Sequence, residues 1–131
     1  MALFQGESMT QPLALVLYEK LLPGSQLVNR LQDLQYRVQT LTDPSLLVPC
    51  AEQAKPIVVL TDLESTYDVR SAISRLRLHP ATRHVPVIAF GGEVSPEGQA
   101  SAEGAGVTLV VSEAAVLNHL EECLEQALHI E

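Results

Sequence analysis

The stretch Lys55-Pro56-Ile57-Val58-Val59-Leu60-Thr61-Asp62 decides the fold of this chain. After the proline, apolar and β-branched residues follow one another without polar alternation, and the run ends in a carboxylate. A run this short and this apolar predicts a strand buried on both faces, as in a parallel sheet covered by helices. Such sheets bind their ligands at the carboxyl ends of the strands. We therefore expect Asp62 at a candidate site, with the capping of a turn or helix as the alternative role of its side chain.

The composition indicates one soluble domain. A chain of 131 residues buries roughly two-thirds of the surface that it exposes when unfolded. The net charge of -8 argues against binding nucleic acid by phosphate neutralisation. There is no signal-peptide pattern, and no apolar run approaches the ~20 residues of a membrane helix. We expect a cytoplasmic protein that binds neither nucleic acid nor a membrane, with Cys50 and Cys123 as free thiols.

Strand and helix patterns alternate along the rest of the chain. The predicted strands are Leu13–Tyr18, Tyr36–Leu41, Ile57–Asp62, Val85–Phe90 and Val107–Val111. The predicted helices begin at about Ser25, at Asp43, at Val69, at Ser95 and at Ser112 or Glu113. We expect residues 1–11 to form a disordered extension and residues 12–131 to form the domain. Five strand-then-helix units predict a three-layer α/β/α sandwich with a parallel sheet, because right-handed crossovers leave few other arrangements.

Local signals predict how the helices start and which faces they bury. Pro23-Gly24 should precede the first helix, Asp43 should cap the second with Pro44 at its first position, and Pro49 should distort it. In the third helix we expect an apolar inner face formed by Val69, Ile73 and Leu76. The basic side chains should face outward, and these are Arg70, Arg75 and Arg77. The last helix carries an apolar stripe of Val116, Leu117, Leu120, Leu124 and Leu128. For His79 and His84 we expect hydrogen bonding within a loop.

Three stretches resemble the receiver domain of two-component response regulators. The segment Leu76-Arg77-Leu78-His79-Pro80-Ala81-Thr82-Arg83-His84-Val85-Pro86-Val87-Ile88-Ala89 resembles the passage from the third helix to the fourth strand of many receivers. Pro56 to Leu63 resembles the strand that carries their phosphoacceptor aspartate, and Ala105 to Val111 resembles the approach to their fifth strand. The likeness covers roughly Leu13 to Leu128. It implies a flavodoxin-like (CheY-like) receiver fold with five parallel strands in the order 2-1-3-4-5.

The resemblance places the phosphoacceptor position at Asp62. Of the acidic pair that helps receivers hold magnesium, one position falls on Glu19 and the other on Tyr18. Magnesium requires octahedral oxygen ligands, and one carboxylate of the pair is missing. The resemblance therefore implies no resident cofactor and at most weak, vestigial Mg²⁺ binding by Glu19 and Asp62.

The other site positions of receivers are also replaced. The hydroxyl residue after the fourth strand falls on Gly91, the switch aromatic on Val110 and the lysine after the fifth strand on Glu113. Phosphotransfer to a carboxylate depends on cations that neutralise the oxygens of the phosphoryl group. A glutamate in place of that lysine is expected to slow the transfer on the order of a hundredfold or more if it faces the acceptor. The contacts that couple phosphorylation to a conformational switch are missing as well.

The leading hypothesis is a degenerate receiver, or pseudo-receiver, that is not an enzyme and acts through protein–protein contacts. Its partner would be a sensor kinase, an effector or a second copy of the chain. The resemblance implies a contact surface formed by the predicted helix 95–103, the strand 107–111 and the last helix. Candidate contact residues are His119, Glu122 and Gln126, for which a plain solvated face is the alternative.

Two other hypotheses remain open. The chain could be a functional single-domain response regulator, phosphorylated on Asp62 with Mg²⁺ held by Glu19 and Asp62. It could also bind a small molecule or cofactor in the crevice at the strand ends. Against a flavin, the chain offers only two Phe, three Tyr and no Trp for stacking.

Overall fold

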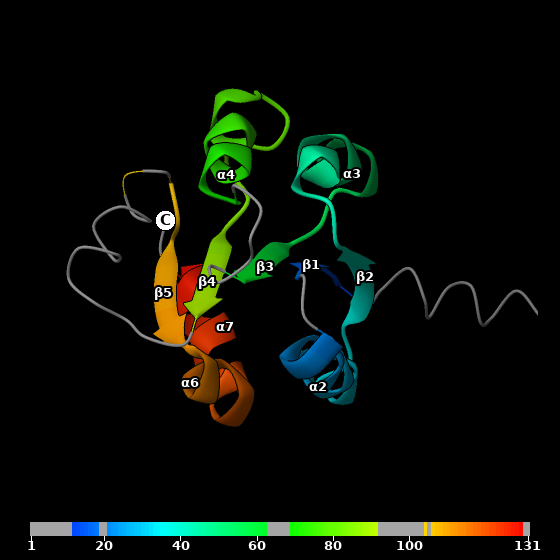
Figure 1. Cartoon of the computed structure of the whole chain (residues 1–131), viewed down its shortest axis with the longest axis vertical. Coiled ribbons are helices and arrows are strands. Elements are labelled where there is room, and N and C mark those ends of the chain that lie inside the picture. The colour runs from blue at the N-terminus through cyan, green and yellow to red at the C-terminus, as the bar shows by residue number, and fades with distance from the viewer. Residues whose placement is uncertain (1–11, 19–20, 63–68, 92–103, 105, 130–131) are drawn as a thin grey trace, which may run out of the picture.

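A computed structural model describes residues 12–18, 21–62, 69–91, 104 and 106–129 (Figure 1). The described elements are β1 (Leu13–Leu17), α2 (Leu21–Asp33), β2 (Arg37–Leu41), the 3₁₀ helix η1 (Pro44–Leu46), α3 (Leu47–Ala54), β3 (Val58–Asp62), α4 (Val69–Leu78), β4 (Val87–Gly91), β5 (Leu109–Ser112), α6 (Glu113–Asn118) and α7 (Leu120–His129). The predicted extension 1–11 and the predicted helix 95–103 lie outside the described residues.

The five strands form one parallel sheet in the order β2-β1-β3-β4-β5. Helices α3 and α4 cover one face, and α2, α6 and α7 cover the other (Figure 1). The predicted class, the three layers and the strand order are confirmed.

Two apolar cores, one on each face, explain why the inner strands lack polar alternation. Leu15 and Leu17 of β1 pack into the core that α3 and α4 cover, whereas Ala14 and Val16 pack into the core beneath α2, α6 and α7. All five residues of β3 and of β4 are likewise buried. Strand β2 lies at the edge of the sheet and is mostly exposed, as its alternating sequence predicts.

Two proline predictions need correction. Helix α2 already begins at Leu21, so Pro23 lies inside its first turn instead of before it. A proline is tolerated there because the first N–H groups of a helix have no partner within the helix. Pro49 likewise lies in the first turn of α3, which follows directly on the 3₁₀ helix η1. α3 is α-helical from Leu47 through Pro49 to Ala54, so the distortion expected at Pro49 is not present, and the change of helix type lies earlier, between Leu46 and Leu47. Asp43 caps the start as predicted, its Oδ1 accepting from the Ser45 N–H at 3.0 Å.

The last helix is not continuous. His119, with φ -130° and ψ 41°, separates α6 from α7. The predicted apolar stripe nevertheless runs across both helices, since Val116, Leu120 and Leu124 are buried and Leu117 packs against the same core.

Arg77 does not face outward as predicted. Its guanidinium group is half-buried, with Nε donating to the Gly106 carbonyl at 2.8 Å and Nη1 donating to the Arg83 and Val85 carbonyls at 2.7 and 2.6 Å. Its Nη2 donates to Thr108 Oγ1 at 3.2 Å. Arg77 therefore joins the end of α4 to the segments that lead into β4 and β5.

The other two arginines of α4 differ from each other. Arg75 is exposed, as predicted. Arg70 is only partly exposed, so its outward prediction is wrong as well, and its Nε is buried without a hydrogen-bond partner within the described part of the chain.

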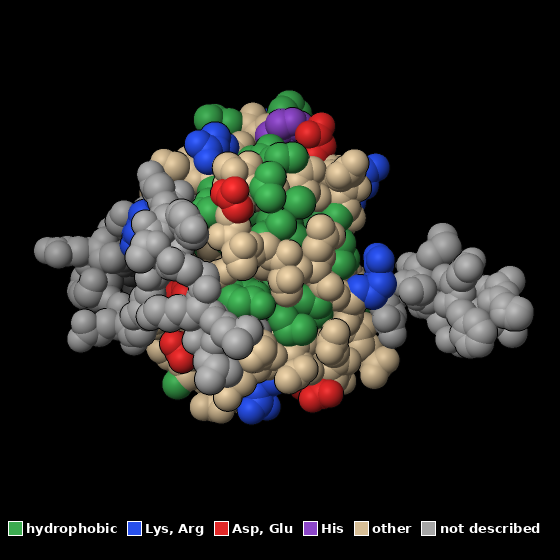
Figure 2. All heavy atoms as spheres, turned by 45° about the vertical axis from the view of Figure 1, so that its right-hand side comes forward, with side chains coloured by type: hydrophobic (Ala, Val, Ile, Leu, Met, Phe, Trp, Pro, Cys, Tyr) green, Lys and Arg blue, Asp and Glu red, His purple; other side chains and the backbone are tan. Residues whose placement is uncertain are grey.

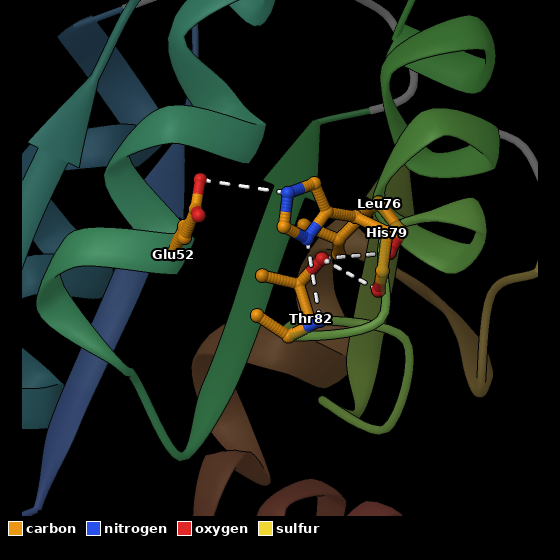
Figure 3. A network of polar contacts seen from close by, with 5 residues as sticks. Glu52, Leu76, His79 and Thr82 are labelled. Atoms are coloured by element: carbon orange, nitrogen blue, oxygen red, sulfur yellow. Dashed lines mark hydrogen bonds and ion pairs between the residues drawn. The ribbon is translucent and has the colours of Figure 1, made fainter.

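A polar network closes the carboxyl end of α4 (Figure 3). Thr82 is fully buried, and its Oγ1 donates to the Leu76 carbonyl at 2.8 Å. His79 Nδ1 accepts from the Ala81 N–H at 3.2 Å, which confirms the predicted loop role of this histidine. Its other nitrogen, Nε2, lies 3.5 Å from Glu52 Oε1 and links the end of α4 to α3.

Large apolar side chains also reach the surface. On the side that carries α3 and β2, apolar side chains gather in patches bordered by polar and charged ones (Figure 2). The large apolar side chains that are exposed include Leu46, Ile57 and Leu78.

None of the described helices combines the length and the apolar character needed to cross a bilayer. Cys50 and Cys123 are free thiols, as expected.

Candidate functional site at the carboxyl edge of the sheet

The strand ends bring the predicted site residues to one edge. Asp62 is the last residue of β3 and lies beside Phe90 in the pairing with β4. The next residue of β4, Gly91, lies beside Ser112 at the end of β5. On the other side of β3, the paired strand β1 ends at Leu17, directly before Tyr18. The carboxyl edge therefore carries the positions of Tyr18, Asp62, Gly91 and, one residue after Ser112, Glu113.

Asp62 is a buried carboxylate with only 3% of its surface exposed. Strand alternation places Asp62 on the same face as Leu60, toward α2, α6 and α7, and places Thr61 on the opposite face. Thr61 is fully buried, and its Oγ1 has no hydrogen-bond partner in the described structure. The edge thus has two polar side chains that the apolar run of β3 places on opposite faces.

The two positions that the sequence resemblance assigned to a receiver switch, Gly91 and Val110, carry no polar or aromatic group. Gly91 is buried and has no side chain to contact a ligand. Val110 lies beside Ala89 in the sheet and packs against the core that α3 and α4 cover. Neither residue supplies a hydroxyl group or an aromatic ring.

The residues at the end of β5 form the start of α6, which gives Ser112 and Glu113 structural roles. Ser112 is the N-cap, and its Oγ accepts from the Ala115 N–H at 3.1 Å. Glu113 is the first residue of the helix and is partly exposed. A carboxylate in the first turn is favourable because the helix dipole is positive there. No Lys or Arg occurs in β4, β5 or α6, so these elements bring no cation to the edge.

The described donors do not make a magnesium site. Within the described ranges, no three His, Cys, Asp or Glu side chains come together as metal ligands. Glu19 lies outside those ranges. Tyr18 is partly buried against the core beneath α2, α6 and α7, and its N–H donates to the Leu41 carbonyl at 3.0 Å. Asp62 alone does not provide the several oxygens that Mg²⁺ requires.

The candidate contact residues, His119, Glu122 and Gln126, lie on the solvent-facing side of α7 and of the residue that precedes it. His119 and Glu122 are exposed and pair with each other, with 2.9 Å between Nδ1 and Oε1. Gln126 is exposed as well, whereas Cys123 and Leu124 face the core. Their exposure fits both a partner surface and a plain solvated face, so their role in binding a partner stays a prediction.

A hollow at the opposite, amino edge of the sheet escaped the sequence reasoning. Arg77, Arg83 and His84 line it, together with apolar residues. The signal in the sequence was the cluster of basic residues in the segment 77–84, which the prediction assigned to a solvated helix face and a loop.

Sequence comparisons identify no relative, whereas structure comparisons do. No protein-family model matches the chain, and no curated protein matches it significantly. The chemotaxis protein CheY4 of Vibrio cholerae superimposes with a TM-score of 0.83 at 19% identity, over 91% of this chain and 100% of that one. The chain has the fold of response-regulator receiver domains.

Other solved receivers give the same result. A response regulator from Thermotoga maritima matches with a TM-score of 0.77 at 16% identity, over 90% of this chain and 98% of that one. The signal receiver domain of a modulated diguanylate cyclase from Desulfovibrio desulfuricans matches with a TM-score of 0.75 at 21% identity, over 91% of this chain and 94% of that one. At these identities the likeness shows the CheY-like receiver fold and leaves the activity to be argued from the site.

Proposed function

We propose that this chain is an atypical receiver domain of two-component-type signalling that works through protein contacts, with little or no phosphotransfer. The observation that carries this proposal is the carboxyl edge of the receiver fold. Asp62 lies buried at that edge, at the position that the resemblance assigns to the phosphoacceptor of receivers. β4, β5 and α6 supply no cation there, and the first residue of α6 is Glu113.

Electrostatics argues against an efficient phosphoryl acceptor. The transferred phosphoryl group carries negative charge on three oxygens, and its transfer relies on cations placed before the reaction begins. If the Glu113 carboxylate faces the acceptor at about 5 Å, in a medium of effective dielectric about 20, it disfavours that charge by about 3 kcal/mol. Such a penalty slows a reaction on the order of a hundredfold.

Packing argues against the usual switch. A modification shifts a conformational equilibrium only through contacts that differ between the two states. Gly91 has no side chain to reach a phosphoryl group, and Val110 is held in the aliphatic core beside Ala89. A phosphoryl group on Asp62 would therefore make few side-chain contacts on β4 and β5 that could differ between two conformations.

A protein partner is the remaining route for output. We infer that the partner, an effector, a sensor kinase or a second copy, binds the side formed by β5, α6 and α7. This side carries exposed polar groups at His119, Glu122 and Gln126. Scattering measured during size-exclusion chromatography tests self-association, and charge reversal at Glu122 should weaken any complex formed through this side.

The second candidate is a phosphorylated receiver, which the burial of Asp62 at the end of β3 favours. Incubation with acetyl phosphate and Mg²⁺, followed by intact-mass measurement, distinguishes the two. We expect no gain of a phosphoryl group by the native chain on the timescale of minutes. Rapid phosphorylation that Asp62→Asn abolishes would overturn the proposal.

A gain-of-function variant sharpens this test. Glu113→Lys places an ammonium at the position where receivers have one, and we expect it to raise the phosphorylation rate on the order of a hundredfold if acceptor and metal positions are otherwise competent. Glu121→Lys is the matched control, because Glu121 is also a first-turn glutamate but belongs to α7 and is exposed. Equal rates in both variants would show that Glu113 does not limit the reaction. Binding of a small molecule at this edge stays a prediction.

A further inference from the structure

A hollow of about 690 Å³ opens at the amino edge of the sheet, at the other end of the strands from Asp62. Its walls come from four segments: the residues that precede β3, the residues that precede β4, the last turn of α4 and the last turn of α7. The residues that line it are Pro56, Ile57, Arg77, Arg83, His84, Val85, Pro86 and Leu128. Its volume lies within the roughly 300–1,000 Å³ typical of small-molecule sites.

Among the described residues that line the hollow, the ionisable side chains are all basic. They are Arg77, Arg83 and His84, and none of the described lining residues is acidic. Arg83 and His84 are exposed, and no ion pair of either is present among the described residues. In a chain with a net charge of -8, this is a local concentration of positive charge.

Arg77 adds a cation that no carboxylate of the described residues neutralises. Its four hydrogen bonds go to three carbonyl groups and one hydroxyl group, all of them neutral. Burial lowers the pKa of the guanidinium below its usual value, which reflects the cost of removing its charge from water. A guanidinium has five N–H donors, and the contacts within the described part of the chain use four of them, which leaves one N–H of Arg77 for a ligand.

The rest of the lining is apolar. Ile57 is 41% exposed, although it directly precedes the fully buried Val58. Pro56, Pro86 and Leu128 complete the apolar wall. Cationic and apolar surface are therefore combined in one hollow, which favours a ligand that has both an anionic and an apolar part.

We propose that the hollow at the amino edge binds a small amphiphilic anion. Its carboxylate or phosphate group would lie against Arg83, His84 and the remaining N–H of Arg77. Its hydrocarbon part would cover Ile57 and Leu128. This site uses none of the residues at the carboxyl edge, so it stands or falls independently of the proposed signalling function.

Amide chemical-shift titrations of the full chain test the proposal. Octanoate and octyl phosphate are the two anionic probes, and they distinguish a carboxylate from a phosphate ligand. Octan-1-ol and octylamine are the neutral and cationic controls. We expect at least one anion to shift amides of Ile57, Arg83 and Val85, with octan-1-ol on the order of tenfold weaker and octylamine weaker still.

Charge reversal provides the matched variants. Arg83→Glu places a negative charge in the lining and should weaken the anion on the order of tenfold or more. Arg75→Glu makes the same change on the exposed side of α4 and should leave affinity unchanged. The proposal is overturned if neither anion binds, if octylamine binds as well as the anions, or if Arg83→Glu binds as tightly as the native chain.

Discussion

The side chain of Arg77 lies directly against Gly106. Its Nε donates to the Gly106 carbonyl at 2.8 Å, and a Cβ added to Gly106 would stand 2.5 Å from Arg77 Cγ. Gly106 also has a φ of +112°, a conformation that residues with a side chain rarely adopt. The arginine can fold over this segment only because the residue beneath it is glycine. This pair holds α4 to the segment that leads into β5.

Gly106→Ala should therefore destabilise the fold. The new methyl group collides with the Arg77 stem and strains the backbone, and together these effects should cost about 2–4 kcal/mol of unfolding free energy. Urea denaturation measures the change.

Gly104→Ala is the matched control for this prediction. A Cβ at Gly104 meets nothing within 4 Å, so its unfolding free energy should stay within about 0.5 kcal/mol of the native value. If both variants unfold at the same urea concentration, the contact between Arg77 and Gly106 does not contribute to the stability of the fold.

Arg77→Lys should also be destabilising, although the charge is retained. The planar guanidinium donates to the Gly106, Arg83 and Val85 carbonyls at the same time. A compact lysine ammonium cannot reach all three, so some of these acceptors lose their donor. We expect a loss of about 2–3 kcal/mol in thermal or urea unfolding. Arg75→Lys, on the exposed side of the same helix, should be neutral, and an equal loss there would argue against this assignment.

The sequence predicted the sheet well because burial on both faces leaves a plain signal. Stretches such as Val58–Leu60 contain no polar residue, and a short apolar run of this kind is typical of a strand between two helical layers. The position of Asp62 followed directly, because a parallel sheet brings all carboxyl ends to one edge. The assignment of Gly91 and Val110 to positions where receivers carry a hydroxyl and an aromatic ring came from the resemblance instead, and it stays a prediction.

The role of Arg77 could not be predicted from helical periodicity. Long polar side chains can lie along a protein surface and reach carbonyl groups far away in the sequence, and a helical wheel contains no information about those groups. The partners of Arg77 lie up to 31 residues along the chain, at Thr108. The hollow at the amino edge was missed for the same reason, since its lining joins segments around Ile57, Arg83 and Leu128 only after folding.

The two thiols should differ in reactivity. Burial, and to a lesser extent the charge of Glu122, raises the pKa of the Cys123 thiol, so little reactive thiolate forms there. Cys50 is partly exposed. An aromatic disulfide reagent at pH 8 should therefore titrate Cys50 in the native chain and Cys123 only after denaturation. Cys50→Ser should abolish the native reaction, and rapid labelling of that variant would contradict the burial of Cys123.

The raised pKa of Cys123 also predicts a loss of stability in alkali. A thiol whose pKa is higher in the folded chain favours folding fully below the unfolded pKa of about 8.5, and this contribution is lost as the pH rises through the folded pKa. Melting temperatures should therefore fall between pH 8 and pH 10. In Cys123→Ala the decline should be shallower, whereas identical pH profiles would show that the thiol has no such effect.

Two buried threonines provide the last prediction, because only one of them has a described partner. Thr82 Oγ1 donates to the Leu76 carbonyl at 2.8 Å, whereas Thr61 Oγ1 has no hydrogen-bond partner, and both side chains are fully buried. Valine has nearly the same shape as threonine but no hydroxyl group. Thr82→Val leaves the Leu76 carbonyl without this donor and should cost about 1–2 kcal/mol of unfolding free energy. Thr61→Val removes a buried polar atom that gains nothing from its surroundings, so it should be neutral or stabilising by up to about 1 kcal/mol. A larger loss in Thr61→Val than in Thr82→Val would mean that the Thr61 hydroxyl, next to Asp62 at the carboxyl edge, has a partner in solution and belongs to the site.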